Sequence, residues 1–287
     1  MEQDSNLRFS AFSYELISVG LATSFSASIQ YKYIDYFYKF QIISINYLLS
    51  FHFFFYIKMW TYYGTKKRIA KNYPAPIYDT IIEPFASAAQ YSLYGDNWKK
   101  KVILLDKYDV VSRVWDYLIN TATKERILAL PNMNIGDKVD DLEGLCQEEK
   151  WLIGFCINSA SAMPKKTAAK FNHWDRYKNF IAENLYKVKH WEIRNGDYTD
   201  LDNIEATWFI DPPYQYGGKY YRYNNKGIDY VKLADWCKNR NGQVIVCENT
   251  KADWLDFKPL VEMNGQLHKT MEAIWYKKDN SATCNAQ

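Results

Sequence analysis

The sequence predicts an α/β fold in which a mostly parallel sheet is flanked by helices. A strand, a turn and a helix start are expected over residues 78–92, and a strand that ends at Asp106 and continues into a helix is expected over 100–119. A further apolar run ends at Asp211. Because parallel strands need a crossover between them, this alternation of strands and helices is typical of a parallel sheet.

The remaining elements extend the same pattern. Residues 120–190 are mostly polar and helical in pattern, with a basic break at 161–171, and they predict a helical insertion. Beyond the insertion, apolar runs and turn residues predict further strands and one helix. The strands are expected within 190–201, at 207–210, 242–249 and 268–278, and the helix at 229–240.

The stretch TWFIDPPY, residues 207–214, combines a strand with an unusual ending. Pro212 and Pro213 have no backbone N–H and cannot continue a ladder, so the chain leaves the sheet at Asp211. Open α/β sheets bind ligands at the carboxyl ends of their strands. An acid, stiff backbone carbonyls and the flat ring of Tyr214 together suit a planar ligand that carries an amino group.

Composition narrows the class of protein. The 287 residues suffice for one large domain, and the net charge of +3 is too small to indicate a nucleic-acid partner by itself. Aromatic residues, at 17%, are compatible with either a core or base stacking. The five cysteines are odd in number and form no C-x-x-C pair, which favours reduced thiols in a cytoplasm over a disulfide framework or a zinc site. None follows a proline, so the usual setting of a nucleophile that attacks the carbon of cytosine is missing.

Residues 1–58 differ in texture from the rest, with no charge between Lys39 and Lys58. We consider this segment an N-terminal extension, and residues 59–287 the main domain. Three interpretations of the extension stand side by side. It is an amphipathic or interfacial helix, a membrane anchor over residues 40–57, or upstream sequence translated from too early a start, with Met59 as the natural one.

Acidic residues end two successive predicted strands. Glu83 precedes Pro84, Phe85 and a turn of small residues, Ala86 to Ala89, which permits close approach of the backbone to a ligand. Asp106 ends the next strand, about twenty residues further on, where an acid is expected to bind ribose hydroxyls. The pattern indicates a nucleotide-like cofactor.

Five short stretches occur in the order found in DNA N6-adenine methyltransferases of the D12 class, the Dam-like group. They are YYGTK (62–66), IIEPFASAAQYS (81–92), LLDKYD (104–109), RNGDY (194–198) and FIDPPY (209–214). The sequence therefore resembles phage-type members of that class over about residues 59–278. Similar proteins usually carry glycine in the turn after EPF, where this chain has Ala86, Ser87 and Ala88.

The resemblance implies a role for each matching residue. It implies that Asp211 and the carbonyl of Pro212 hold the amine of the target adenine, with Pro213 completing the motif and Tyr214 stacked on the base. S-adenosylmethionine is the implied cofactor, with Asp106 on its ribose and Asp197 on its adenine amine. The residues implied at its methionine end are Tyr62, Tyr63, Gly64, Lys66, Glu83, Phe85, Ala86 and Ser87.

The implied function is transfer of a methyl group from S-adenosylmethionine to adenine N6 in double-stranded DNA, by a monomer that needs no metal. Lys165, Lys166, Lys219 and Arg222 are candidates for phosphate contacts. Two alternatives stay open. One is methylation of RNA or of cytosine N4, and the other is a DNA-binding protein whose methyltransferase site has decayed.

Overall fold

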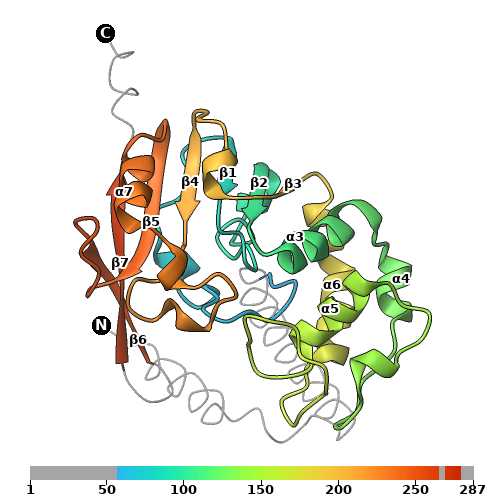
Figure 1. The fold of residues 1–287 in the computed structure, drawn as a ribbon. Helices are drawn as coiled ribbons and strands as arrows, with labels where there is room; N and C mark the ends of the chain where they lie inside the picture. The colour runs from blue at the N-terminus through green and yellow to red at the C-terminus, as the bar shows by residue number, and fades with distance from the viewer. Residues whose placement is uncertain (1–56, 265–268, 279–287) are drawn as a thin grey trace, which may run out of the picture. The chain divides into compact units, whose positions relative to one another are not determined.

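The computed structural model describes residues 57–264 and 269–278, and its centre is a seven-stranded sheet (Figure 1). The strands lie in the order β3-β2-β1-β4-β5-β7-β6. Their bounds are β1 Thr80–Glu83, β2 Lys101–Asp106, β3 Glu192–Asn195, β4 Ala206–Ile210, β5 Gly242–Asn249, β6 Lys258–Asn264 and β7 Lys269–Lys277.

Strand direction defines the class of fold. Strands β1 to β5 pair in parallel, whereas β7 runs antiparallel to both β5 and β6. This order with a single reversed strand is the Rossmann-like sheet of S-adenosylmethionine-dependent methyltransferases. The fold class expected from the sequence is therefore confirmed, including its mostly parallel sheet.

Helices cover both faces of the sheet. Their bounds are α3 Asp109–Asp116, α4 Lys124–Ala129, α5 Gln147–Cys156, α6 Trp174–Asn184 and α7 Tyr230–Lys238. Successive strand residues point to opposite faces, so Ile81 and Phe209 pack into the core cluster that includes α3, α5 and α6. Ile82 and Trp208 pack on the other side, with α7. Helices α4, α5 and α6 lie together on one side of the domain, beyond β3 (Figure 1).

One expectation about local structure is wrong. The helix expected to start after β1 is absent from the described residues, because residues 84–96 form successive turns apart from two residues without assigned structure and one isolated bridge residue. Ser87 and Ala89 there have φ values of 44° and 45°, in the left-handed region that a right-handed helix excludes. The terminal strand is present but has a partner that the sequence reading missed, since β6 precedes it and forms the edge of the sheet.

The N-terminal extension falls outside the described residues, apart from its last two positions. Ile57 and Lys58 are buried, together with Met59 and Trp60. The interpretations of residues 1–56, including the membrane anchor, stay predictions. Among residues 57–264 and 269–278, no helix is long and apolar enough to cross a membrane.

We expect the domain to depend on the chain from residue 57 onward. Trp60 is fully buried, and its ring centroid lies 4.5 Å from that of Trp115 and 6.0 Å from that of Phe155. Trp60→Ala should lower the free energy of unfolding by about 3–5 kcal/mol, because it leaves a cavity. A variant that lacks residues 1–56 should unfold like the full chain. Chemical denaturation measures both, and a large loss in the truncated variant would contradict the boundary.

Candidate active site

The carboxyl ends of the parallel strands bring the predicted acids to one edge of the sheet. Glu83 ends β1, Asp106 ends β2, and Asp211 follows β4 directly. Asp197 lies two residues beyond the end of β3. Strand pairing in the order β3-β2-β1-β4 therefore turns four positions that are distant in sequence into one row.

Asp106 holds the turn after β1. Its two carboxylate oxygens each accept a backbone N–H at 2.9 Å, one from Ser87 and one from Tyr108. Burial raises the pKa of Asp106 to about 6, although these two hydrogen bonds favour the charged form. Trp115 donates its indole N–H to the carbonyl of Ser87 at 2.9 Å. Ser87 has a φ of 44°, in the left-handed region that glycine usually occupies. Hydrogen bonds at its backbone N–H and at its carbonyl hold it in this conformation.

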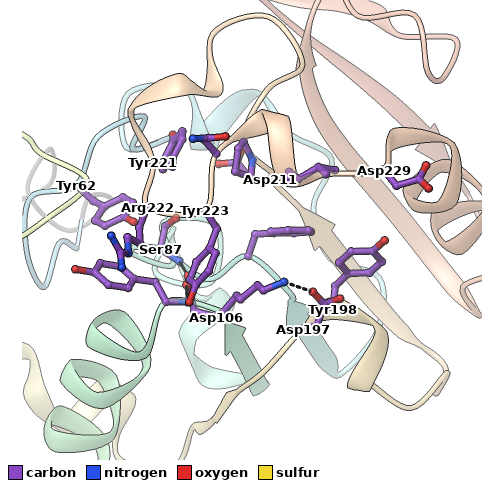
Figure 2. Close-up of a pocket in the computed structure, with 17 residues that line it drawn as sticks. Tyr62, Ser87, Asp106, Asp197, Tyr198, Asp211, Tyr221, Arg222, Tyr223 and Asp229 are labelled. Carbon is purple, nitrogen blue, oxygen red and sulfur yellow. Dashed lines mark hydrogen bonds and ion pairs between the residues drawn. The ribbon is translucent and has the colours of Figure 1, made fainter.

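A first cavity of about 240 Å³ opens beside Asp106 (Figure 2). Phe85, Asp197 and Asp211 also line it, as does Tyr198, whose ring centroid lies 5.7 Å from that of Phe85. Two carboxylates and a pair of aromatic rings are suited to the hydroxyls and the flat base of a nucleoside. Part of the wall comes from Tyr221, Arg222 and Tyr223, which belong to the loop after the DPPY motif.

Asp197 is more exposed than the buried Asp106 on the same cavity. It accepts from the Lys107 ammonium at 3.0 Å and from the backbone N–H of Thr199 at 3.3 Å. Partial burial opposes its charge, but these donors hold the pKa of Asp197 below its ordinary value. The carboxylate is therefore ionised at neutral pH and can accept a donor from a ligand.

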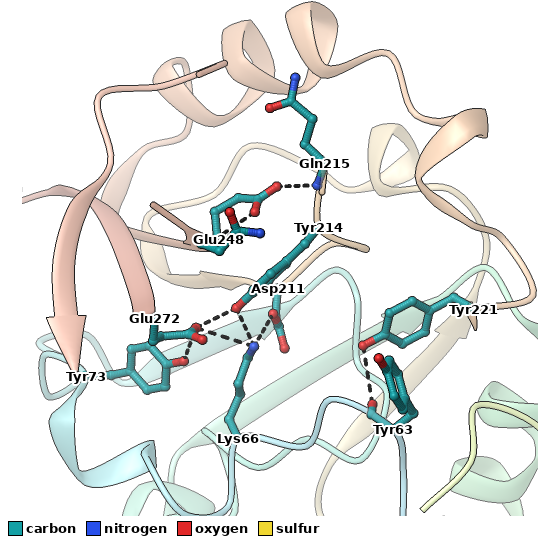
Figure 3. A network of polar contacts seen from close by, with 10 residues as sticks. Tyr63, Lys66, Tyr73, Asp211, Tyr214, Gln215, Tyr221, Glu248 and Glu272 are labelled. Atoms are coloured by element: carbon teal, nitrogen blue, oxygen red, sulfur yellow. Dashed lines mark hydrogen bonds and ion pairs between the residues drawn. The ribbon is translucent and has the colours of Figure 1, made fainter. Parts of the chain in front are cut away.

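Asp211 belongs to a buried polar network on the other side of the motif (Figure 3). The Lys66 ammonium lies 3.1 Å from a carboxylate oxygen of Asp211 and 3.4 Å from one of Glu272. The hydroxyl of Tyr214 donates to the same Glu272 oxygen at 2.5 Å and contacts Lys66 Nζ. Tyr73 donates its hydroxyl to Glu272 at 2.7 Å.

The network sets the ionisation of its members. Burial raises the pKa of Asp211 to about 6, with Lys66 opposing the rise and Glu272 adding to it. Burial also opposes the charge of Lys66, but Asp211 and Glu272 together hold the pKa of Lys66 above its ordinary value. Asp211 is consequently ionised at neutral pH in spite of its burial, because a cation lies beside it.

Glu272 is a site residue that the sequence analysis missed. It is 1% exposed, and its Oε2 has no hydrogen-bond partner among the described residues. Glu272 pairs with Asn249 in the antiparallel register of β5 and β7, so it lies at the carboxyl end of β5. Glu272 could be predicted only from the direction of β7. If β7 ran parallel to β5, Glu272 would lie near the amino end of β5, away from the other acids.

The backbone of the DPPY motif is held from both sides. The Tyr230 hydroxyl donates to the carbonyl of Pro213 at 2.6 Å, and the backbone N–H of Gln215 donates to buried Glu248 at 2.5 Å. Pro212 itself is buried and lines neither the first cavity nor the second one described below. Of the two acceptors expected for an amino group, Asp211 is the one that faces a cavity, and the role of the Pro212 carbonyl stays a prediction.

Tyr214 and Lys66 line a second, larger cavity of about 740 Å³. Its volume lies within the roughly 300–1,000 Å³ of small-molecule sites. Tyr63, Gly64 and Tyr216 contribute to its wall. The Tyr214 ring lies under the Lys66 ammonium, which is 4.3 Å from its centroid. Asp211 is thus shared between the two sides of the motif, facing the first cavity while it pairs with Lys66.

Tyr62 and Tyr221 line both cavities and form the wall between them. The Tyr221 hydroxyl lies 3.3 Å from the carbonyl of Tyr63, which accepts it (Figure 3). Gly64 has a φ of 72°, and a Cβ there would collide with the hydroxyl of Tyr221. A glycine is therefore required at position 64 for both backbone and space.

We expect Gly64→Ala to destabilise the protein by more than Gly144→Ala does. Gly144 has a φ of 69° with nothing near its missing Cβ, so that variant suffers only the left-handed backbone penalty of about 1–2 kcal/mol. Gly64→Ala must also displace Tyr221. Unfolding free energies measure both, and adding Tyr221→Ala should remove the excess. Equal losses in the two single variants would show that Tyr221 is not held against Gly64.

The remaining predicted residues differ in whether they line one of the two cavities. Glu83 is buried, accepts from the backbone N–H of Ser92 at 2.8 Å and has its pKa raised to about 8 by burial, so it ties down the turn. Ala86 is buried in the same turn. Arg222 lines the first cavity. Lys165, Lys166 and Lys219 line neither of the two cavities, and Lys166 pairs with Asp140 at 3.0 Å.

Comparison with known proteins yields distant structural likenesses. No family profile and no curated protein sequence matches the chain. Its structure is similar to the yhhF protein of Escherichia coli, provisionally named a methyltransferase, with 8% identity and a TM-score of 0.32 over 74% of this chain and 80% of that one. HI0767 of Haemophilus influenzae, provisionally named a methylase, has 11% identity and a TM-score of 0.31 over 70% and 80%. The fold assignment rests on the strand order described above, not on these scores.

Proposed function

We propose that this chain is an S-adenosylmethionine-dependent DNA adenine N6-methyltransferase of the D12 class. The observation that carries the proposal is the position of Asp211. It follows β4 directly and lines the first cavity, of about 240 Å³, while the neighbouring Lys66 and Tyr214 line the larger one. A methyl donor in the first cavity and an amine from the second would meet at this carboxylate.

The residues of the first cavity fit S-adenosylmethionine. Asp106 retains free lone pairs for ribose hydroxyls, because each of its oxygens accepts only one backbone N–H. Asp197 is placed to accept from the adenine amine, and Phe85 and Tyr198 offer rings to the base. When bound, the cofactor supplies an electrophilic methyl group that is transferred by direct displacement.

The protein contributes orientation and a change in the shape of the target amine. The lone pair of an adenine amine is delocalised into the ring, so the nitrogen is a poor nucleophile. Asp211 and the Pro212 carbonyl accept its two N–H groups and favour a tetrahedral nitrogen, whose lone pair is then free. Fixed acceptors also reduce the entropy that an in-line transfer would otherwise lose. Lys66 keeps Asp211 ionised for this task.

Access to the site requires the adenine to leave the duplex. Tyr214 offers the aromatic face for stacking, a contact worth about 1–3 kcal/mol per base in other proteins. In the structure its hydroxyl is already bound to Glu272 at 2.5 Å, which restrains rotation of the ring before a base arrives. Glu272 therefore acts as a positioning residue for the motif.

Sequencing DNA for methylated adenine tests the function directly. The full chain is expressed in a host that lacks adenine methylation, beside an Asp211→Ala chain. The proposal requires N6-methyladenine at a defined sequence in the first culture and its absence in the second. Methyl transfer to RNA alone, or to cytosine N4, would support the alternative enzymes. Binding of labelled S-adenosylmethionine separates both from a decayed site, which would not retain it.

A further inference from the structure

Four basic residues gather beside the second cavity, and we call them the basic rim: Lys58, Lys67, Arg68 and Arg176. Lys58, Lys67 and Arg68 line this cavity, together with Tyr177, the residue next to Arg176. Arg68 and Arg176 are exposed. None of these four residues was singled out by the sequence for DNA contacts. Arg176 lies in α6 and Lys58 lies before Met59, so the chain does not place them next to each other.

Among the described residues, no carboxylate neutralises the positive charge of the basic rim. Within residues 57–264 and 269–278, no carboxylate forms an ion pair with any of the four. Burial lowers the pKa of Lys58 and of Lys67, and the neighbouring Arg176 and Arg68 lower both further. Like charges at this spacing repel one another, so an anion bound among them would relieve the repulsion.

An aromatic ring orders part of the rim. The Lys58 ammonium lies 5.3 Å from the ring centroid of Tyr177, and the Arg176 guanidinium lies 5.8 Å from the same centroid. Both cations are therefore held against one ring by cation–π attraction. The rim is thus a positioned set of cations, in contrast to Lys166, which is exposed and paired with Asp140.

We propose that the basic rim binds backbone phosphates of duplex DNA that flank the nucleotide whose base enters the second cavity. The inference rests on the proposed function and adds to it the surface that binds the DNA backbone. The geometry supports it because the cavity that the rim borders is also lined by Lys66, Tyr214 and Glu272. A base stacked on Tyr214 must remain linked to phosphates outside the cavity, and the exposed Arg68 and Arg176 beside the cavity suit these anions.

Salt-dependent binding tests the rim without requiring methyl transfer. Fluorescence anisotropy measures the affinity of the full chain for a labelled DNA duplex over a series of salt concentrations. The variant is Lys67→Gln/Arg68→Gln/Arg176→Gln, which leaves buried Lys58 in place. Each lost phosphate contact should make the slope of log K against log salt shallower by about 0.9, so we expect a change of about 2–3. The matched control is Lys124→Gln/Lys232→Gln/Lys238→Gln, which removes the same number of charges from exposed helix positions that line neither cavity.

The outcomes separate the rim from the proposed function. A shallower slope in the rim variant and an unchanged slope in the control support the rim, even if the chain proves unable to methylate DNA. An unchanged slope in the rim variant, equal losses in both variants, or no duplex binding by the parent chain would each overturn it. The rim variant and the control variant must melt at the same temperature as the parent chain. If the rim variant unfolds, Lys67→Gln alone replaces it in the same measurement.

Discussion

Asp211→Ala is expected to lower kcat by about 10²- to 10⁴-fold while cofactor affinity stays within a few-fold of the parent value. Under the proposed function Asp211 accepts from the target amine, whereas Asp106 and Asp197, which line the same cavity, are left intact to bind the cofactor. Kinetics at saturating S-adenosylmethionine and equilibrium binding of the labelled cofactor provide the two measurements. Near-normal turnover in the variant would show that Asp211 does not hold the target amine.

Asp211→Asn is the matched control, because an amide keeps an acceptor oxygen but has no charge to lose. In the parent protein the pKa of Asp211 is about 6, so kcat should fall as the pH drops through that value and the carboxylate takes up a proton. Asp106 has a similar pKa, but its titration should appear in cofactor binding. Any activity that Asp211→Asn retains should show no such fall in kcat.

Lys66→Met is expected to lower the free energy of unfolding by about 3–5 kcal/mol in mildly alkaline buffer. Lys66 is the cation between two buried carboxylates, at 3.1 Å from Asp211 and 3.4 Å from Glu272. Without it, two buried carboxyl groups face each other with no cation between them. Lys67→Met, one position along, removes a lysine among like charges and should change stability little.

The deficit of Lys66→Met should shrink as the pH is lowered. Loss of the cation moves the pKa of Asp211 above its present value of about 6, further from its value in the unfolded chain. A carboxyl group with a raised folded-state pKa favours folding below that pKa, and the contribution disappears as the pH rises through it. Denaturation at about pH 5.5 and about pH 8.5 measures the difference. A deficit independent of pH would mean that Lys66 acts through packing alone.

The part of the site that the sequence predicted lies where short-range patterns meet a general property of parallel sheets. Asp106 and Asp211 each follow an apolar strand, and the carboxyl ends of parallel strands share an edge. Their proximity could therefore be inferred before any coordinates. The turn after β1 could not, because Ser87, with its left-handed φ, donates its N–H to Asp106 and accepts at its carbonyl from Trp115, and both partners are distant in sequence.

The basic residues near the second cavity could not be predicted from the sequence. The sequence pointed to Lys165 and Lys166 because they are adjacent in a basic stretch, yet neither lines a cavity of the site. Lys67 and Arg176 are far apart in the chain, and the packing of α6 beside the segment after Met59 brings their charges together. Linear charge patterns report local density, whereas a binding surface depends on which elements are neighbours.

By itself, the sequence determined the fold class, the order of most strands along the chain and the acids at their ends, because these follow from apolar periodicity and from residues that stop a strand. Tertiary structure alone decided that β7 runs antiparallel beside β5, which places Glu272 against Tyr214 and Lys66. Strand direction depends on pairing between distant segments, and no local pattern encodes it. The charge on Asp211 is decided in the same way, by a lysine that only the folded chain brings to its side.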